Sequence, residues 1–173
     1  MNPIIKKSFV CCFIVTLALI FAANVLSIAP SFDLGDCQDA QTLAADDGYV
    51  PDLVISENCS NYGSVDWAGT NLNLTDLGEV QADEVSIGHG YVYVNSITRP
   101  DIDYPAHIVL RNLSYAYTPV IKKDGLSCPT NNCTSVTYNK VTGIIEFDVS
   151  EFSNYSVSGR QDFTVYSDTQ AYL

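Results

Sequence analysis

The sequence predicts an all-β domain, a sandwich or a barrel, preceded by one hydrophobic N-terminal helix. Apolar and polar residues alternate with a period of two in several runs after residue 51. Turn signals rich in Gly, Pro, Asn and Asp separate these runs at intervals of roughly 8–12 residues, as in sandwiches and barrels. The only long uninterrupted apolar stretch lies near the N-terminus. With 173 residues, the chain has the length of about one domain.

The N-terminal stretch predicts a signal peptide or a membrane anchor over residues 1–29. A basic head, Met1–Lys7, precedes 22 residues without charge, Ser8–Ala29. A helix of that length would cross a hydrocarbon core of about 30 Å. A cleaved signal usually has a shorter apolar region. Val25–Ser27 offers small residues at the spacing of a cleavage site, whereas Pro30 disfavours cleavage directly after Ser27–Ala29. Cleaved or uncleaved, the basic head stays inside and the rest of the chain is exported.

Residues 30–50 are small, polar and acidic, and we expect an acidic connector there, tied down by Cys37. Residues 51–173 are expected to form the β-domain. In that part Ile145, Phe147 and Val149 alternate with more polar neighbours, which predicts one buried and one wet face. The expected strands lie near 52–56, 64–67, 84–88, 91–97, 106–113, 118–123, 135–140, 143–150, 154–158 and 162–168.

The charge excludes binding to a nucleic-acid backbone. Lys and Arg number 8 and Asp and Glu 20, so the formal net charge is −12. From Pro30 onward 6 basic residues stand against 20 acidic ones, a net charge of −14. Such a surface has little with which to replace the counterions around phosphates. We therefore expect no nucleic-acid partner.

Four cysteines follow the apolar segment: Cys37, Cys59, Cys128 and Cys133. An even number in an exported domain predicts disulfides, with three possible connectivities. The sequential pairing is favoured, because Cys128 and Cys133 flank a short, turn-rich loop whose ends can meet. Zinc is the alternative, but the two histidines, His89 and His107, do not lie at zinc-finger spacing.

The chain also carries Asn-X-Ser/Thr sequons, which are acceptors for N-glycans in exported proteins. Any single sequon arises easily by chance, but five in one exported domain predict a glycoprotein. The candidate sites are Asn58, Asn73, Asn112, Asn132 and Asn154.

The region from about 84 to 157 resembles an Ig-like β-sandwich module of archaeal secreted and cell-surface proteins. The resemblance is carried by short motifs: Val85–Gly88, Pro105–Leu110, Val120–Gly125 before the Cys128 and Cys133 pair, Gly143–Val149 and Phe152–Val157. It implies an Ig-like architecture and an archaeal cell surface or extracellular location. It implies no common chemistry, since such modules share none.

The sequence contains no hydrolase motif, and we expect no enzymatic activity and no cofactor. His89 and His107 are expected to be surface histidines. Asp101 and Asp103 are candidates for a Ca²⁺ site, but the full Asp-rich loop is absent, so at most weak binding is expected. Trp67 and Phe147 are expected in the core.

The other aromatic candidates form either a sugar-stacking strip or the rim of the core; they are Tyr91, Tyr93, Tyr115, Tyr117, Tyr155 and Tyr166.

Together these features predict a non-enzymatic cell-surface or secreted β-sandwich with an envelope-structural or adhesion role. Its partners would be the membrane, through an uncleaved helix, and other surface proteins or glycans. The alternative is a subunit of an extracellular filament, similar to archaeal pilins or archaellins. An apolar N-terminal helix with a glycosylated β head suits that alternative. The helix ends by Pro30, however, which is short for a filament core.

Overall fold

A computed structural model describes residues 31–41, 48–74 and 79–159 of the chain. The N-terminal helix expected over 1–29 and the strand expected at 162–168 lie outside the described residues. Within them, the structure is almost entirely β, and no helix is long and apolar enough to cross a membrane. The predicted all-β class is confirmed for this part of the chain.

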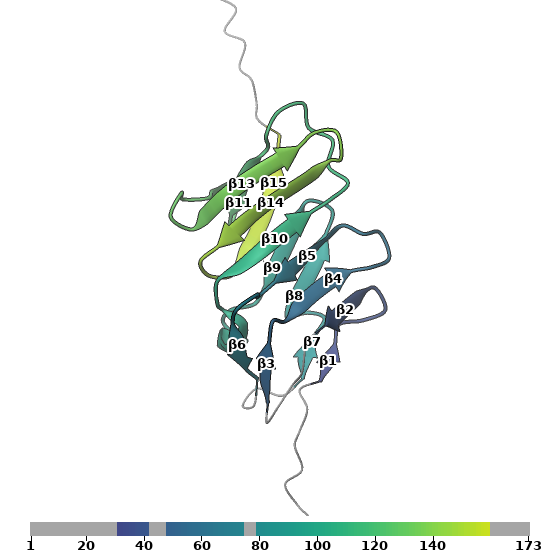
Figure 1. Cartoon of the computed structure of the whole chain (residues 1–173), viewed down its shortest axis with the longest axis vertical. Coiled ribbons are helices and arrows are strands. Elements are labelled where there is room, and N and C mark those ends of the chain that lie inside the picture. The colour runs from purple at the N-terminus through teal and green to yellow at the C-terminus, as the bar shows by residue number, and fades with distance from the viewer. Residues whose placement is uncertain (1–30, 42–47, 75–78, 160–173) are drawn as a thin grey trace, which may run out of the picture.

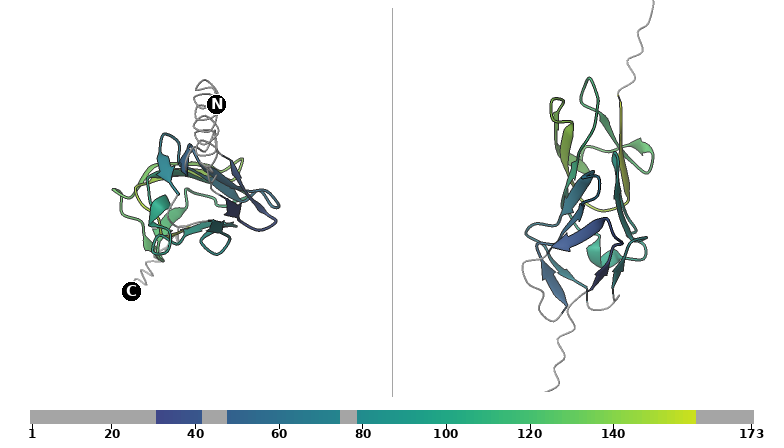
Figure 2. Two further views of the ribbon diagram at one scale, coloured as in Figure 1. Left: turned by 90° about the horizontal axis from the view of Figure 1, so that it is seen from below. Right: turned by 90° about the vertical axis from the view of Figure 1, so that its right-hand side faces the viewer.

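Two antiparallel sheets form the body of the domain (Figures 1 and 2). The six-stranded sheet has the order β13-β14-β10-β5-β4-β2 and the five-stranded sheet has the order β12-β11-β15-β9-β8. Two short ladders, β1-β7 and β3-β6, lie at one end. The strands of the six-stranded sheet are β2 (Gln38–Gln41), β4 (Val54–Glu57), β5 (Gly63–Asp66), β10 (Ala106–Leu110), β13 (Cys133–Asn139) and β14 (Ile144–Val149). Those of the five-stranded sheet are β8 (Val85–Gly88), β9 (Tyr91–Val94), β11 (Val120–Lys123), β12 (Leu126–Ser127) and β15 (Asn154–Ser158). The short ladders use β1 (Phe32–Asp33), β3 (Tyr49–Pro51), β6 (Asn71–Asn73) and β7 (Val80–Gln81).

The core fills the space between the two sheets. Every second residue of the central strands points inward, as the period-two pattern predicts; Ile108 and Phe147, for instance, stand opposite each other on β10 and β14. From the other sheet, Val92 and Tyr155 are also fully buried. The expected core positions of Trp67 and Phe147 are confirmed, since neither side chain is exposed.

The Trp67 ring closes the core beside a short 3₁₀ helix, η1 (Pro100–Ile102). Its indole Nε1 donates a hydrogen bond of 3.1 Å to the carbonyl oxygen of Ile102. The ring also packs against Phe152, with ring centroids 5.1 Å apart. The one polar atom of the ring is therefore satisfied, so the side chain is buried without an unpaired donor.

The described parts of the acidic segment, residues 31–41 and 48–50, belong to the domain, in contrast to the connector we expected. Its strand β2 forms the edge of the six-stranded sheet against β4, β1 pairs with β7, and β3 pairs with β6. Leu34 and Val50 bury their side chains in the core. An edge strand has a neighbour on one side only and keeps a large exposed surface, so its sequence stays polar and shows little alternation.

The opposite edge of the same sheet is interrupted. Strand β13 shifts its register against β14 between Thr134 and Thr137, and Ser135 there has a positive φ of 53°. The hairpin that joins β13 to β14 turns at Gly143, whose φ is 67°. A Cβ at Gly143 would lie 2.4 Å from the carbonyl oxygen of Leu113, so only glycine fits there.

Candidate functional site

An imidazole and two carboxylates lie in one row on the outer face of the six-stranded sheet. Asp66 on β5 stands directly opposite His107 on β10, and His107 stands opposite Asp148 on β14. Residues paired in this way project from the same face, with Cβ atoms about 4.5–5.5 Å apart. A shallow hollow of about 310 Å³ opens at this row, and its apolar walls are Ala68, Pro105, Ala106 and Val149.

Two hydrogen bonds organise Asp148. The Nδ1 atom of His107 lies 2.7 Å from Oδ1 of Asp148, and the hydroxyl of Ser135 also donates to this carboxylate. The hydrogen bonds from Ser135 and then His107 hold the pKa of Asp148 below its ordinary value. Because an ionised carboxylate only accepts hydrogen bonds, Nδ1 of His107 carries the proton in this pair. The bulge at Ser135 thus brings its hydroxyl to the row.

This arrangement is not a catalytic triad. A nucleophilic triad needs a hydroxyl or thiol on the imidazole nitrogen that faces away from the carboxylate. Ser135 instead contacts the carboxylate side, and no Ser, Thr or Cys lines the hollow as far as the structure describes it. What the row presents is an oriented imidazole between two carboxylates.

Asp66 holds an unusual position in the row. Its Oδ1 atom is buried and has no hydrogen-bond partner, the only such side-chain oxygen or nitrogen among the described residues. A buried polar atom left unsatisfied costs about 1–3 kcal/mol, more when it is charged, so each such atom calls for an explanation. The sequence had marked His107 as a lone surface histidine and had not singled out Asp66 or Asp148.

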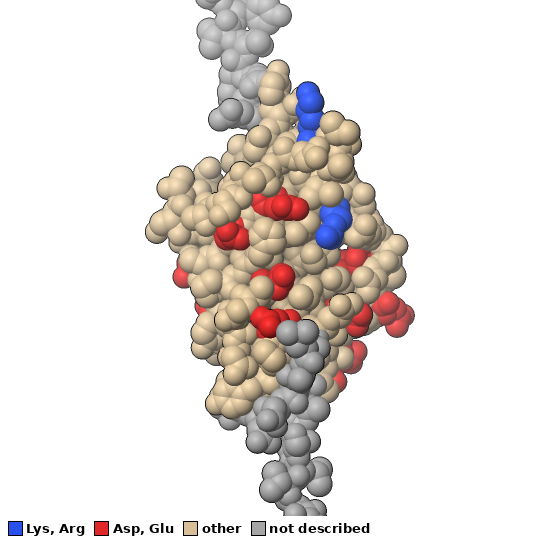
Figure 3. Space-filling view, viewed as in Figure 1, with Lys and Arg blue, Asp and Glu red and all other residues tan. Residues whose placement is uncertain are grey.

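Several acidic side chains lie on this same face (Figure 3). Figure 3 shows several of them over the middle of the six-stranded sheet, which lies in front in Figure 1, and Lys or Arg side chains toward one end. Asp39 and Glu146 share the outward direction with the Asp66–His107–Asp148 row. A face with this charge raises the local concentration of cations.

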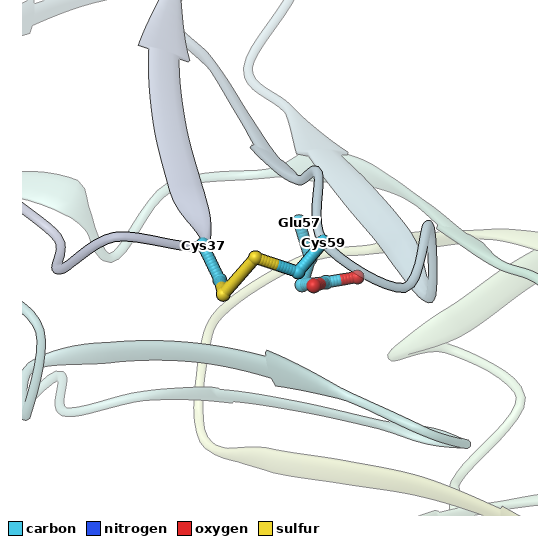
Figure 4. A group of neighbouring side chains, drawn as sticks. All are labelled: Cys37, Glu57 and Cys59. Carbon is cyan, nitrogen blue, oxygen red and sulfur yellow. A yellow bond between two sulfur atoms is a disulfide. The ribbon is translucent and has the colours of Figure 1, made fainter.

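The second cluster surrounds a disulfide. The structure pairs Cys37 with Cys59 and Cys128 with Cys133, which are the sequential pairs that the spacing favours. Glu57 lies beside the first pair (Figure 4). In the part of the chain that the structure describes, these three residues are the one group of His, Cys, Asp or Glu close enough together to suggest a metal site. Their potential ligand atoms all lie within 4.8 Å of one another. Both sulfurs belong to the disulfide bond, so they offer no thiolate to a metal.

Glu57 has a structural role in this cluster. Its carboxylate accepts backbone N–H bonds from Tyr62 at 2.8 Å and from Ser60 at 2.9 Å. The Tyr62 bond, with smaller contributions from Ser60 and Cys59, keeps the pKa of Glu57 below its ordinary value although burial opposes this. The carboxylate therefore fixes the turn after β4 and places Cys59 opposite Cys37.

The Ca²⁺ candidates do not converge on one point. Both oxygens of Asp101 are bound by the guanidinium of the buried Arg99, at 2.9 and 2.7 Å. One oxygen of Asp103 instead accepts the backbone N–H of Phe152. With their oxygens engaged by donors of the protein, these two carboxylates tie η1 to the body of the domain and do not form a shared cation site.

The other candidates from the sequence have the following positions. His89 is exposed, as expected, with Nε2 3.0 Å from the carbonyl oxygen of Asn112 and its ring edge-on to Tyr62. Four of the five sequon asparagines are exposed and Asn132 is half-buried. Two of them use their amide nitrogen inside the protein: Asn112 donates to the Ser60 carbonyl and Asn132 to the Glu151 carboxylate. Glycosylation of the sequons stays a prediction.

The tyrosines are divided between the core and the surface. Tyr155 is fully buried and Tyr115 is half-buried, whereas Tyr117 is exposed; Tyr166 lies outside the described residues. Tyr91 and Tyr93 lie on the outer face of the five-stranded sheet. The ring of Tyr91 rests on Gly88, where a Cβ would meet a ring carbon at 2.3 Å. Among the candidates in the described residues, Tyr91 and Tyr93 are therefore the two whose rings lie together on this outer face, and two rings do not make an extended sugar-stacking strip.

No family model, no curated protein and no solved structure matches this chain. The resemblance to archaeal Ig-like surface modules therefore remains a prediction.

Proposed function

We propose that this protein is a non-enzymatic, exported β-sandwich module that acts as a spacer at the cell surface, with an envelope-structural or adhesion role. The observation that carries the proposal is the path of the chain. The described chain begins at β1 near one end of the elongated domain and leaves β15 at the opposite end (Figures 1 and 2). A module with this path separates whatever is attached at its two ends by the full length of the sandwich.

Two further features support an extracellular setting. The domain carries two disulfides, which persist in oxidising compartments and are rare in reducing ones. Cys37–Cys59 fastens the β2 edge strand to the body, so the segment nearest the N-terminal end resists being pulled off the sheet. A net charge of −14 after residue 29 favours solubility and discourages adsorption to anionic polymers.

The proposal is tested by topology on intact cells. A full-length protein with one epitope at its N-terminus and another at its C-terminus is probed with antibodies before and after permeabilisation. We expect the C-terminal epitope to be accessible on intact cells, or to be found in the medium, and free thiols to be absent from the exported domain under non-reducing conditions. A C-terminal epitope that is detected only after permeabilisation, together with four alkylatable thiols, would contradict the proposal.

The filament alternative is distinguished by the mature N-terminus. Sequencing of the exported protein that starts near Phe9 would indicate pilin-type processing, and electron microscopy should then show filaments. A start near Ile28 indicates secretion, and an intact Met1 or Asn2 indicates a membrane anchor. We expect one of the last two.

A further inference from the structure

We propose that Asp66 and His107 form a binding site for a divalent transition-metal ion, with Asp148 positioning the imidazole. The site lies on the outer face of the six-stranded sheet, at the hollow beside Ala68 and Pro105. The inference does not depend on the spacer function, because it rests on different residues.

The state of His107 makes its second nitrogen a ligand. With Nδ1 occupied by Asp148 at 2.7 Å, Nε2 is the ring nitrogen left to bind a metal ion, and it lies on the other side of the ring from that carboxylate. Metal-binding histidines almost always donate their other ring N–H to a carboxylate, a carbonyl or water, which fixes the tautomer and makes the ligand nitrogen more basic. Ser135 also hydrogen-bonds the Asp148 carboxylate, which helps to hold the partner of the ring in place.

Asp66 supplies the oxygen ligand. It faces His107 from the strand opposite to that of Asp148, and its Oδ1 is the buried oxygen that no donor in the described part of the chain satisfies. A cation at the hollow would satisfy this atom. Asp148 is a positioning residue and not a third ligand, because its carboxylate is engaged by Nδ1 of His107.

The donor set selects the class of metal. One imidazole nitrogen and one carboxylate oxygen suit Zn²⁺, Co²⁺, Ni²⁺ or Cu²⁺, whereas Ca²⁺ requires six to eight oxygens. The remaining coordination positions open into the hollow and would be filled by water. The half-exposed His107 and Asp148, at 40% and 44%, let the ion exchange with solvent. The site is therefore one for a reversibly bound ion, with positions free for a ligand from outside.

The test is titration of the full-length, untagged, metal-free protein in detergent with ZnCl₂, followed by calorimetry, and with Co²⁺, followed by its visible absorption. We expect one ion bound per chain through this site. Asp66→Asn and His107→Gln should weaken binding most. Asp148→Asn should weaken it by about 10–100-fold, the usual effect of removing such a hydrogen-bond partner.

Two matched variants control the experiment. Glu146→Gln removes one charge from the same face, and His89→Gln removes the other histidine; both should bind Zn²⁺ as the unaltered protein does. Circular dichroism verifies that each variant is folded, which we expect because each change nearly conserves side-chain volume and lies outside the core between the sheets. The proposal is overturned if no one-to-one binding occurs up to millimolar Zn²⁺, if Asp66→Asn binds as well as Glu146→Gln, or if His89→Gln abolishes binding.

Discussion

Arg99 offers the sharpest test of how this domain is held together. It is the largest charged side chain in the core, with 1% of its side chain exposed. Its guanidinium forms a bidentate ion pair with Asp101, donates to Oε2 of Glu84 at 3.4 Å, and donates to the carbonyl oxygen of Glu79 at 3.0 Å. Asp101 and Glu84 are themselves only 10% and 18% exposed.

The perturbation is Arg99→Met, which keeps much of the volume and removes the charge. Two largely buried carboxylates then lose their shared counter-ion, and breaking one side of a buried ion pair costs about 3–5 kcal/mol. A domain of this size is stable by about 5–15 kcal/mol, so a large share of its stability would be lost. At a urea m-value of about 2 kcal/mol/M, the midpoint should fall by roughly 2 M.

The assay is urea unfolding followed by fluorescence. Trp67 is the only tryptophan in the chain, it is fully buried, and it donates a hydrogen bond to Ile102 in the turn that Arg99 precedes. Its emission therefore reports on this region directly. The control is the triple variant Arg99→Met, Asp101→Asn, Glu84→Gln, which leaves no buried unpaired charge and should recover much of the loss.

A loss below about 1 kcal/mol for Arg99→Met, the size typical of a surface ion pair, would refute this reasoning. So would a triple variant that is less stable than the single one. Either result would mean that the carboxylates reach water easily once the guanidinium is removed.

Three further predictions concern the disulfides, Glu57 and Tyr155. Replacing Cys37 and Cys59 by Ser should lower the free energy of unfolding by about 3.4 kcal/mol, and replacing Cys128 and Cys133 should lower it by about 2.1 kcal/mol. The first change costs more because its disulfide closes a loop of 22 residues and the second closes a loop of 5. Equal midpoints in urea for the two double variants would contradict this order. Because the pKa of Glu57 is lowered, its contribution to stability is complete above its ordinary pKa of 4.5 and is lost as the pH falls through the lower pKa of the folded state. The free energy of unfolding, measured from pH 6 downward, should therefore fall less steeply for Glu57→Gln than for the unaltered protein. Parallel curves would contradict this role of the carboxylate. Burial, and then the charge of Glu151, raises the pKa of Tyr155, so the folded state favours the neutral phenol and loses stability as the pH rises above about 10. Tyr155→Phe should remove that alkaline loss and cost about 1 kcal/mol at neutral pH, from the hydrogen bond of 2.7 Å to the Glu151 carbonyl; an unchanged alkaline transition would count against this assignment.

The strands that could be read from the sequence are those with a strong local signal. The alternation locates β14 within one residue at each end; it locates the start of β10 at Ala106 but extends that strand three residues past Leu110. It also assigns Phe147 and Ile108 to the core. Strands β1, β2 and β3 were missed because they are short and lie at edges, where burial on one side is incomplete and the pattern stays polar.

The candidate site was only partly visible from the sequence. The period-two pattern placed His107 on the solvent side of its strand, and the structure agrees. It gave no reason to connect His107 with Asp66 and Asp148, each of which lies 41 residues away along the chain. Nor did it show that Asp101 would be held by Arg99, because the side-chain direction at a turn depends on what packs against the turn.

By itself, the sequence determined the all-β class and the two faces of the central strands, and it favoured the sequential cysteine pairs over two other connectivities. These depend on the alternation of neighbouring residues and on short loops, which are local properties of the chain. Only the tertiary structure decided which residues stand side by side across the sheets. Register between antiparallel strands is set by the joint fit of both sheets and their turns, and a shift of one residue would turn His107 away from Asp66 and Asp148 and into the core.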